Sequence, residues 1–236
     1  MIMKSSLEDI RKKFDTNVEI YSNEEIGQTS AMDSLLVLQM IADTAALTNP
    51  NAKTMCDIGC GGGNFTIKIL HKLPNLSCTL VDLSKPMLDR AQERIRAIGG
   101  TVECVVQSAI QTAELKRGGY DVIVAGAVLH HLRTKDEWSL VLRKIYDALA
   151  DGGTFFYWDL INHEREEIDR IQRERYKQYL IGVKGKEYQQ KVFADIEQED
   201  TPETVTFILT QFLKSSFRDV DVIHKNGMFA ALAGKK

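Results

Sequence analysis

A glycine-rich turn with an acid just before it is the part of the sequence best suited to hold a ligand. The stretch TMCDIGCGGGNFTIKIL (54–70) runs apolar, turns on four glycines and resumes as an amphipathic run. Gly59, Gly61 and Gly63 have no Cβ, so the backbone there can approach a ligand closely. A helix that starts near Asn64 would aim its N–H groups at the same place.

Two common phosphate-binding motifs do not fit this turn. The dinucleotide fingerprint needs a glycine where Asn64 stands, and the G-K-[ST] end of a Walker loop is absent. Asp57 would repel a pyrophosphate but suits a cationic ligand. Asp82 ends the next apolar run, where a carboxylate can accept both hydroxyl groups of a ribose. A cation joined to a ribose without phosphate describes S-adenosylmethionine (SAM), unless Asp57 only caps a helix and Asp82 only forms a turn.

The acids and glycines need a sheet to position them, and a strand–helix rhythm begins at residue 54. Near-continuous apolar runs suit parallel strands that are covered on both faces. Ser84 and Thr134 are expected to cap two of the intervening helices. The alternation predicts the α/β class, with a doubly wound sheet. The expected strands span residues 54–58, 77–82, 101–106, 120–125 and 154–159.

The flanking regions follow other patterns. We expect N-terminal helices over 5–14 and 31–48, joined by an irregular linker over 16–30. Residues 160–199 are charged and helical in pattern, and form a solvated face, a lid over a substrate or a dimer surface. Thr201 and Pro202 should begin another helix. Asn226-Gly227 predicts a closing antiparallel hairpin. The expected organisation is an N-terminal helical cap (1–50) and a ligand-binding domain (51–236).

Composition limits the classes of partner. The 236 residues are 44% hydrophobic, which suits one domain, or a core with a modest appendage. With 30 basic and 33 acidic residues, the chain has no general attraction to nucleic acid or to an anionic membrane. No run approaches the about 18 apolar residues of a membrane span, so we expect a cytoplasmic protein. The four cysteines form no C-x-x-C pair, and each is expected to be a small buried hydrophobe.

Four motifs together resemble those of the class I SAM-dependent methyltransferases. They are D-x-G-x-G-x-G at 57–63, VDLS at 81–84, YDVIVAGAVLHHL at 120–132 and LADGGTFFYWD at 149–159. The resemblance covers about 54–236 and is specific for the fold and cofactor but poorly specific for substrate. It implies a Rossmann-like sheet of seven strands, mostly parallel, with a C-terminal antiparallel hairpin and a helical insertion after the fifth strand.

Carried over by position, the resemblance implies a set of SAM contacts. Asp57 and the backbone of Gly59, Cys60 and Gly61 should border the methionine part, and Asp82 should bind the ribose.

The remaining implied contacts concern the adenine and the methyl group. Leu83 and Met87 should pack on the adenine. The acid that often meets the adenine amino group is replaced here by Ser108 and Ala109, so a hydroxyl or the backbone must serve. Ala125 and Gly126 should lie near the methyl group.

Three further side chains are candidates for the chemistry. His130 and His131 follow the fourth strand and Asp159 ends the fifth, so all three should face the same crevice. A histidine there can act as a general base or orient the substrate, or His131 can simply cap a helix or fill space. Tyr21 is expected among the cofactor contacts if it folds over the site from the N-terminal segment; otherwise it packs on the core as a linker aromatic. Since residues 125–127 lack the metal-binding acid of catechol-type enzymes, no metal is expected.

The layout is closest to two branches of the family. VLHHL (128–132) is frequent in small-molecule methyltransferases similar to quinone C-methyltransferases. FDTNV (14–18) and the long helical stretch before the hairpin resemble the tRNA wobble-uridine carboxymethyltransferases, which use carboxy-SAM. That branch pairs the extra carboxylate with an arginine in the last helix, and ETVTFILTQFL (203–213) has none. Ordinary SAM, with S-adenosylhomocysteine as its product, is therefore favoured.

We accordingly expect methyl transfer from SAM to a small-molecule acceptor by in-line displacement. Two alternatives stay open. One is a tRNA-modifying enzyme, in which a homodimer would assemble a basic groove that the near-neutral chain lacks. The other is a SAM-binding protein without catalysis.

Overall fold

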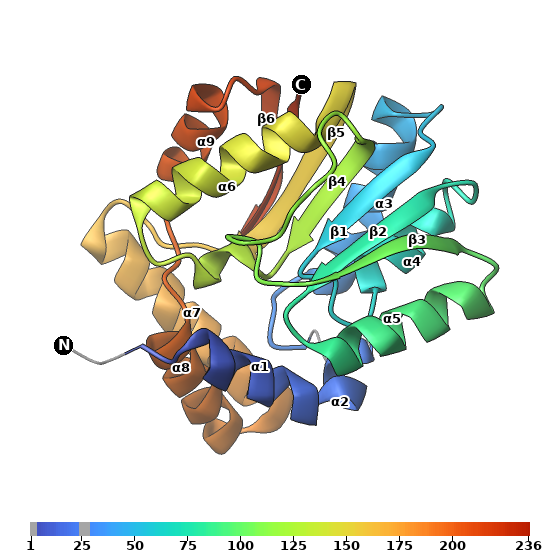
Figure 1. The fold of residues 1–236 in the computed structure, drawn as a ribbon. Coiled ribbons are helices and arrows are strands. Elements are labelled where there is room, and N and C mark those ends of the chain that lie inside the picture. The colour runs from blue at the N-terminus through green and yellow to red at the C-terminus, as the bar shows by residue number, and fades with distance from the viewer. Residues whose placement is uncertain (1–3, 24–28) are drawn as a thin grey trace.

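A sheet of seven strands, in the order β3-β2-β1-β4-β5-β7-β6, runs through the computed structural model, which describes residues 4–23 and 29–236 (Figure 1). β1 to β5 run parallel, and β7 lies antiparallel between β5 and β6. The predicted mostly parallel sheet with a closing hairpin is confirmed. The strands are β1 (Thr54–Ile58), β2 (Ser77–Asp82), β3 (Thr101–Gln107), β4 (Tyr120–Gly126), β5 (Leu149–Leu160), β6 (Arg218–Asn226) and β7 (Phe229–Lys235).

Helices cover both faces of the sheet because the central strands are apolar on both sides. In β5, Phe156 and Trp158 pack into one hydrophobic cluster, and Phe155 and Tyr157 pack into the other. The first cluster includes residues of α3, α4 and α5, and the second includes residues of α6 and α9. These helices are α3 (Ser34–Thr48), α4 (Asn64–Leu70), α5 (Lys85–Ala97), α6 (Lys135–Ala148) and α9 (Val205–Lys214).

Side-chain caps set where several helices begin. As predicted, the hydroxyl of Ser84 accepts from Met87 N, and Thr134 forms a capping box at α6. The predicted start at Thr201 and Pro202 is wrong. Thr204 caps α9 instead, since its hydroxyl accepts from Phe207 N, whereas the backbone N–H of Thr201 donates to His130 O over 2.7 Å.

The prediction that the parallel strands are covered on both faces is wrong for β3. β3 is the outermost strand, so most of its residues are exposed rather than covered on both faces. Cys104 lies on this strand and is exposed, whereas the other three cysteines are buried as expected.

The remaining helices gather at the edge where the parallel strands end, in the lower half of Figure 1. They are α1 (Leu7–Thr16), α2 (Val18–Ser22), α7 (Glu166–Lys184) and α8 (Lys186–Glu199). Part of the expected 16–30 linker is therefore helical, and residues 24–28 of it lie outside the described residues.

The helices of the expected N-terminal cap (1–50) lie in two different places in the structure. α1 and α2 lie over the carboxyl edge of the sheet, whereas α3 buries Val37, Leu38 and Ile41 completely in the core. Within the described residues, no helix combines the length and apolar character needed to cross a bilayer.

Candidate active site

A cavity of about 640 Å³ lies between the carboxyl edge of the sheet and the helices that cover it. The ends of β1, β2 and β4, α1, α2 and α8 all contribute to its walls. The predicted site residues that line it are Tyr21, Gly59, Cys60, Gly61, Asp82, Leu83, Met87, Ser108, Ala109, His130, His131 and Asp159.

The glycine turn and Asp82 form one preorganised unit. The backbone N–H of Gly61 donates to Asp82 Oδ2 and that of Ser84 donates to Asp82 Oδ1, both over 2.8 Å. Burial raises the pKa of Asp82, although these backbone donors oppose the shift. Each carboxylate oxygen keeps lone pairs for further donors, so two neighbouring hydroxyl groups of a ribose fit this carboxylate.

The glycines of the turn serve different purposes. A Cβ on Gly59 would lie 2.5 Å from Val128 Cγ2, so packing against the loop after β4 requires glycine there. A Cβ on Gly61 would meet no atom within 4 Å, and Gly61 has a φ of +49° and lines the cavity. Gly61 is therefore the position where the missing side chain leaves room for a ligand.

Asp57 lies behind the turn rather than in the cavity. Its side chain is buried beneath α4 and accepts a hydrogen bond from Thr66 Oγ1 over 2.7 Å. Burial raises the pKa of Asp57 to about 7. Asp57 thus does not line the cavity as predicted, because its side chain is buried against Thr66, and it supports the loop from behind.

The end of β4 corrects a second contact. Ala125 is fully buried in the hydrophobic cluster beneath α6 and does not line the cavity. Because successive positions along a strand alternate between its faces, Gly126 borders the cavity instead, and Ala127 follows it in the loop after β4.

The loop after β3 closes the part of the cavity near Met87. The backbone N–H of Ser108 donates to Asp82 O over 3.0 Å, which ties this loop to the end of β2. The hydroxyl of Ser108 lies 2.9 Å from Thr112 Oγ1. Ile110 and Gln111 also line the cavity, and sequence reasoning did not include them. Gln111 adds an amide to the polar groups available near an adenine.

Asp159 anchors the opposite wall of the cavity. It is fully buried at the end of β5, where its carboxylate accepts from the backbone N–H groups of Val128, Leu129, His130 and Leu160. Asp159 Oδ1 also bonds Nδ1 of the His130 ring. With its oxygens occupied in this way, Asp159 fixes the position of the 3₁₀ turn Leu129–His131.

His130 does not suit the predicted role of a free base. Burial alone would lower its pKa, but the carboxylates of Asp159 and Asp200 outweigh that effect and raise it to about 9. Its ring is therefore charged near neutral pH, with both nitrogens directed at carboxylates. The prediction that His130 accepts a proton near pH 7 is not supported by this environment.

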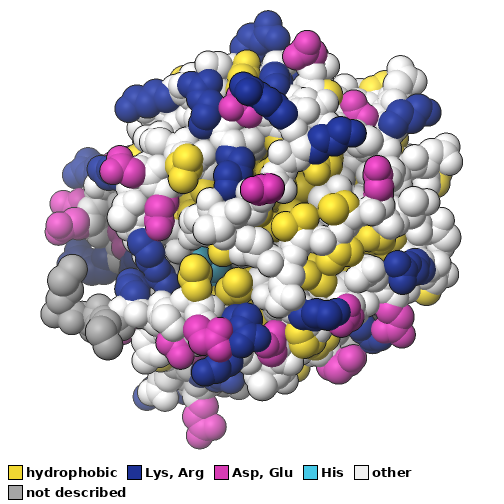
Figure 2. Space-filling model, in the orientation of Figure 1, with side chains coloured by type: hydrophobic (Ala, Val, Ile, Leu, Met, Phe, Trp, Pro, Cys, Tyr) yellow, Lys and Arg dark blue, Asp and Glu magenta, His cyan; other side chains and the backbone are white. Residues whose placement is uncertain are grey.

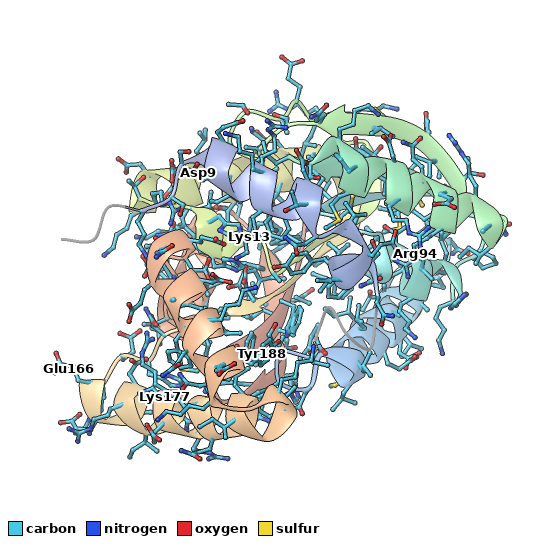
Figure 3. All side chains as sticks on the ribbon, turned by 90° about the horizontal axis from the view of Figure 1, so that it is seen from below. Asp9, Lys13, Arg94, Glu166, Lys177 and Tyr188 are labelled. Atoms are coloured by element: carbon cyan, nitrogen blue, oxygen red, sulfur yellow. The ribbon has the colours of Figure 1, made fainter. Side chains whose placement is uncertain are left out.

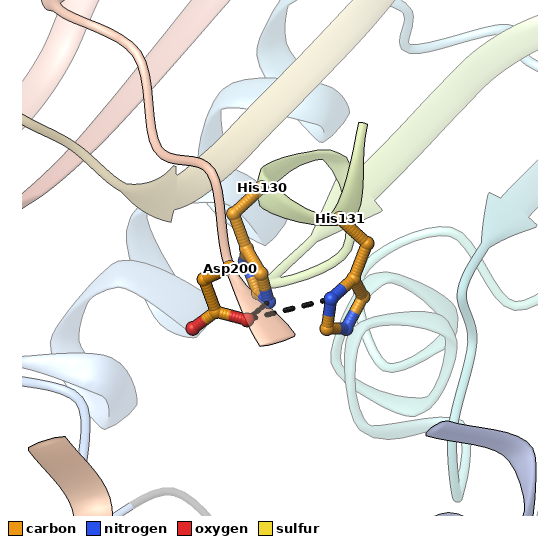
Figure 4. Close-up of side chains that lie close together, drawn as sticks. All are labelled: His130, His131 and Asp200. Carbon is orange, nitrogen blue, oxygen red and sulfur yellow. Dashed lines mark ion pairs between the residues drawn. The ribbon is translucent and has the colours of Figure 1, made fainter. Parts of the chain in front are cut away.

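His131 and Asp200 complete a cluster with His130 (Figure 4). Asp200 Oδ1 lies 3.4 Å from His130 Nε2 and 3.4 Å from His131 Nδ1. Burial raises the pKa of Asp200 to about 6. Burial and the neighbouring His130 hold the pKa of His131 well below its ordinary value. We call these three residues the histidine–aspartate cluster.

α1 and α8 meet above the cavity through a half-buried cation, Lys13. Lys13 Nζ lies 3.0 Å from Asp195 Oδ2 and 2.8 Å from Glu199 Oε2, both on α8. Figure 3 shows Lys13 beneath α1, on the side that faces α8. The backbone N–H of Ser5 also donates to Gln198 O over 2.9 Å. These contacts close the cavity on the side away from the sheet.

Sequence reasoning missed Asp200 and Lys13 for a physical reason. Each contacts residues that lie far away in the sequence, and neither belongs to a motif or to a periodic apolar pattern. The charged composition of 160–199 indicated a lid, a dimer surface or a solvated face, and the structure shows α8 lining the cavity through Tyr188, Val192 and Ile196.

Comparison with known proteins points to one class of enzyme. A family model described as a methyltransferase domain matches residues 56–155. A carboxy-S-adenosyl-L-methionine synthase of Campylobacter lari is 28% identical over 181 residues, which is 75% of this chain and 74% of the relative. An uncharacterized methyltransferase of Mycobacterium bovis is 32% identical over 103 residues, or 43% of this chain and 48% of the relative.

Solved structures show the same fold. A SAM-dependent methyltransferase of Leishmania major matches with a TM-score of 0.65 and 17% identity, over 99% of this chain and 87% of that one. Human N-acetylserotonin methyltransferase, solved in complex with SAM, matches with a TM-score of 0.58 and 17% identity, over 99% of this chain and 63% of that one.

Proposed function

We propose that this chain, a class I SAM-dependent methyltransferase with SAM as its cofactor, transfers the methyl group to a small-molecule acceptor held beneath α1 and α8. The observation that carries the proposal is the roofed cavity of about 640 Å³. That volume falls within the about 300–1,000 Å³ typical of small-molecule sites. The cofactor and a small acceptor must share it.

The two ends of the cavity are suited to bind different reactants. The glycine turn, Asp82 and Met87 form a cofactor end, and the histidine–aspartate cluster with Tyr21, Tyr176 and Tyr188 forms an acceptor end. Bound SAM supplies an electrophilic methyl group on a positively charged sulfur, and displacement by a lone pair of the acceptor leaves S-adenosylhomocysteine.

The chain's own residues contribute positioning and exclusion of water. Asp82 and the backbone at Gly61 fix one reactant, while Asp159 fixes the turn that carries His130 and His131 at the other. Holding two reactants in contact is worth about 7–11 kcal/mol of barrier at most. The roof made by α1 and α8 keeps water from competing, and neutralisation of charge during transfer is favoured in such a pocket.

A second candidate function is synthesis or use of carboxy-SAM. Its support is the name of the relatives that are 27–28% identical over about three quarters of the chain. Against it, the lysines and arginines among the described residues that line the cavity are Lys13, Lys184 and Lys191. Lys13 is already paired with Asp195 and Glu199. The last helix, α9, lacks an arginine and does not line the cavity.

A tRNA substrate has less support than a small molecule. The net charge is −3, and Figure 2 shows Lys and Arg side chains interspersed with Asp and Glu side chains on the face drawn. Binding to nucleic acid depends on neutralising many phosphates, which a mixed surface does poorly.

Two measurements test the proposal. Mass spectrometry of the ligand released from purified protein should find SAM or S-adenosylhomocysteine, and finding carboxy-SAM would favour the second candidate. Transfer of a labelled methyl group should then be followed with a panel of phenols, enols, hydroxy acids and amines beside bulk tRNA. Labelling of tRNA alone would overturn the small-molecule acceptor.

A further inference from the structure

We propose that His130, His131 and Asp200 bind one divalent transition-metal ion of the Zn²⁺ class at the acceptor end of the cavity. The ligand atoms are His130 Nε2, His131 Nδ1 and a carboxylate oxygen of Asp200. The open coordination position takes an oxygen of the acceptor, an inference that rests on the proposed methyl transfer.

The spacing of the three atoms suits a metal ion. One atom from each residue lies within 4.8 Å of the other two, and both nitrogen–oxygen distances are 3.4 Å. A tetrahedral ion with bonds of about 2.0–2.1 Å to nitrogen and oxygen separates its ligands by roughly 3.3–3.5 Å. At 3.4 Å the same atoms are too far apart for a good hydrogen bond. His131 Nδ1 also lies 3.4 Å from Glu199 O, so an ion would take the place of these long contacts and of the proton that His130 carries toward Asp200.

The ligands are held in place before any ion arrives. His130 Nδ1 bonds Asp159, which leaves Nε2 directed at Asp200. This arrangement is the carboxylate–histidine pair that commonly supports a metal ligand from behind. Asp159 is fixed in turn by four backbone N–H groups, and the two histidine rings lie with centroids 4.2 Å apart.

Charge and ligand type select the class of ion. Two imidazole nitrogens and one carboxylate suit Zn²⁺ and neighbouring transition metals rather than Mg²⁺ or Ca²⁺, which prefer all-oxygen sites. Asp159 and Asp200 place two carboxylates around His130 in a largely buried region, and a dication would replace the proton on His130 and offset that charge.

The site differs from the one that the sequence excluded. No acid stands at residues 125–127, where catechol-type enzymes hold their metal. The histidine–aspartate cluster instead combines the turn after β4 with the residue that ends α8, so the roof of the cavity contributes a ligand. Such a site is complete only when α8 is in place.

Three protein ligands and an open position typify catalytic rather than structural metal sites. A hydroxyl group of a phenol, enol or hydroxy acid bound there becomes more acidic and releases its proton to solvent water as it binds, before water is excluded from the cavity. The oxygen lone pair then forms the bond to the methyl carbon, the carbon–sulfur bond breaks, and its electron pair remains on sulfur. The inference therefore narrows the acceptor to a hydroxylated small molecule.

Direct metal binding tests the site without relying on activity. Protein treated with a chelator and dialysed is titrated with Co²⁺, followed by visible d–d absorption, and with Zn²⁺, followed by calorimetry. We expect one ion per chain.

His131→Ala and Asp200→Asn should each abolish the tetrahedral cobalt spectrum, and Asp159→Asn should weaken the affinity for the metal ion about 10–100-fold. His163→Ala is the matched control, because His163 also lies near an aspartate, Asp169, but outside this cavity, and it should leave binding unchanged.

Calorimetric SAM binding shows that each variant is folded. The proposal is overturned if Co²⁺ does not bind, or if it binds equally well to His131→Ala and Asp200→Asn that bind SAM normally. Methyl transfer to the small-molecule panel, measured with and without Zn²⁺, reports separately on the proposed function. Metal binding with labelling only of tRNA would retain the site and reject the small-molecule acceptor.

Discussion

The two ends of the cavity are built in different ways. At the cofactor end, backbone N–H groups join the ends of β1, β2 and β3, as when the N–H of Gly61 donates to Asp82 Oδ2 and that of Ser108 donates to Asp82 O. At the acceptor end, side chains from α1, the turn after β4 and α8 meet across long stretches of sequence. Lys13 pairs with Glu199, and His130 faces Asp200.

This difference separates what the fold dictates from what the individual chain adds. A backbone cradle depends on glycine positions and one acid, so related sheets that keep them can keep the cofactor. A cluster of side chains from a helical insertion can change without disturbing the sheet. Substrate choice is therefore expected to reside in α1, α8 and the histidine–aspartate cluster, and changes at one end should leave the other end intact.

The largest effect should come from Gly61→Val. The branched side chain would occupy open space beside the cavity, and a β-branched residue is strained at a φ of +49°. We expect SAM binding, measured by calorimetry, to be lost while the circular dichroism spectrum is kept.

Gly118→Val provides the control for strain alone. Gly118 has a φ of +61° and no atom within 4 Å of its Cβ position, but it does not line the cavity. Its variant should bind SAM with unchanged affinity. Normal SAM binding by Gly61→Val would show that the turn does not hold the cofactor.

Asp82→Ala should have the next largest effect. It removes the proposed acceptor of the ribose hydroxyl groups and also a partner of Gly61 N, so SAM affinity should fall by about 1.5–3 kcal/mol. Asp121→Ala is the control, because Asp121 likewise accepts backbone N–H groups, of Lys53 and Thr54, at the opposite edge of the sheet. Equal affinity losses in the two variants would contradict the ribose assignment.

Much of the fold could be predicted because it follows from local patterns. The apolar runs, the caps at Ser84 and Thr134 and the Asn226-Gly227 hairpin each depend on a few neighbouring residues, and all are present. The failures arise where tertiary position decides. Thr201 has the chemistry of a cap, but its N–H bonds His130 instead. Cys104 is apolar by type, yet the edge position of β3 leaves it exposed.

The site shows the same division. The order of motifs placed Asp82 and Gly61 in one cavity, but it could not tell that Asp57 lies behind the turn or that Ala125 points away from it. Those errors concern depth and side-chain direction at a strand end. Asp200 could not be inferred at all, since 69 positions separate it from His131 and only the packing of α8 brings the two together.

Asp57→Asn should change the pH dependence of stability more than SAM affinity. The native Asp57 keeps its proton up to about pH 7 because it is buried, whereas in the unfolded chain it loses the proton near its ordinary value. Its contribution is thus most favourable at low pH and is lost as pH rises toward 7. Between pH 5 and pH 7 the loss should be about 2 kcal/mol of unfolding free energy.

Urea unfolding of the parent chain and the variant at both pH values measures this difference. In Asp57→Asn the unfolding free energy should no longer fall by this amount between pH 5 and pH 7. Asp43→Asn, which changes an exposed aspartate paired with Lys72, should keep the fall. Parallel slopes in the parent chain and Asp57→Asn would contradict the assignment. An affinity loss as large as that of Asp82→Ala would return Asp57 to the ligand-contacting set.

The smallest effect should come from Lys13→Met, which tests the roof. Methionine keeps much of the length of the side chain but removes the ion pairs with Asp195 and Glu199, and such partly exposed pairs contribute about 0–1 kcal/mol each. Local opening of α8 should therefore become more frequent, without a measurable change in global stability. Amide exchange over 186–199 should be faster in the variant and should slow when SAM and an acceptor are added.

Lys72→Met, which breaks the pair with Asp43 between α3 and the end of α4, is the control and should leave exchange in α8 unchanged. Since the proposed SAM contacts lie at the other end, SAM affinity should stay constant while KM for the acceptor rises. Equal protection of α8 in the parent chain and Lys13→Met, with and without ligands, would make α8 a fixed wall rather than a lid.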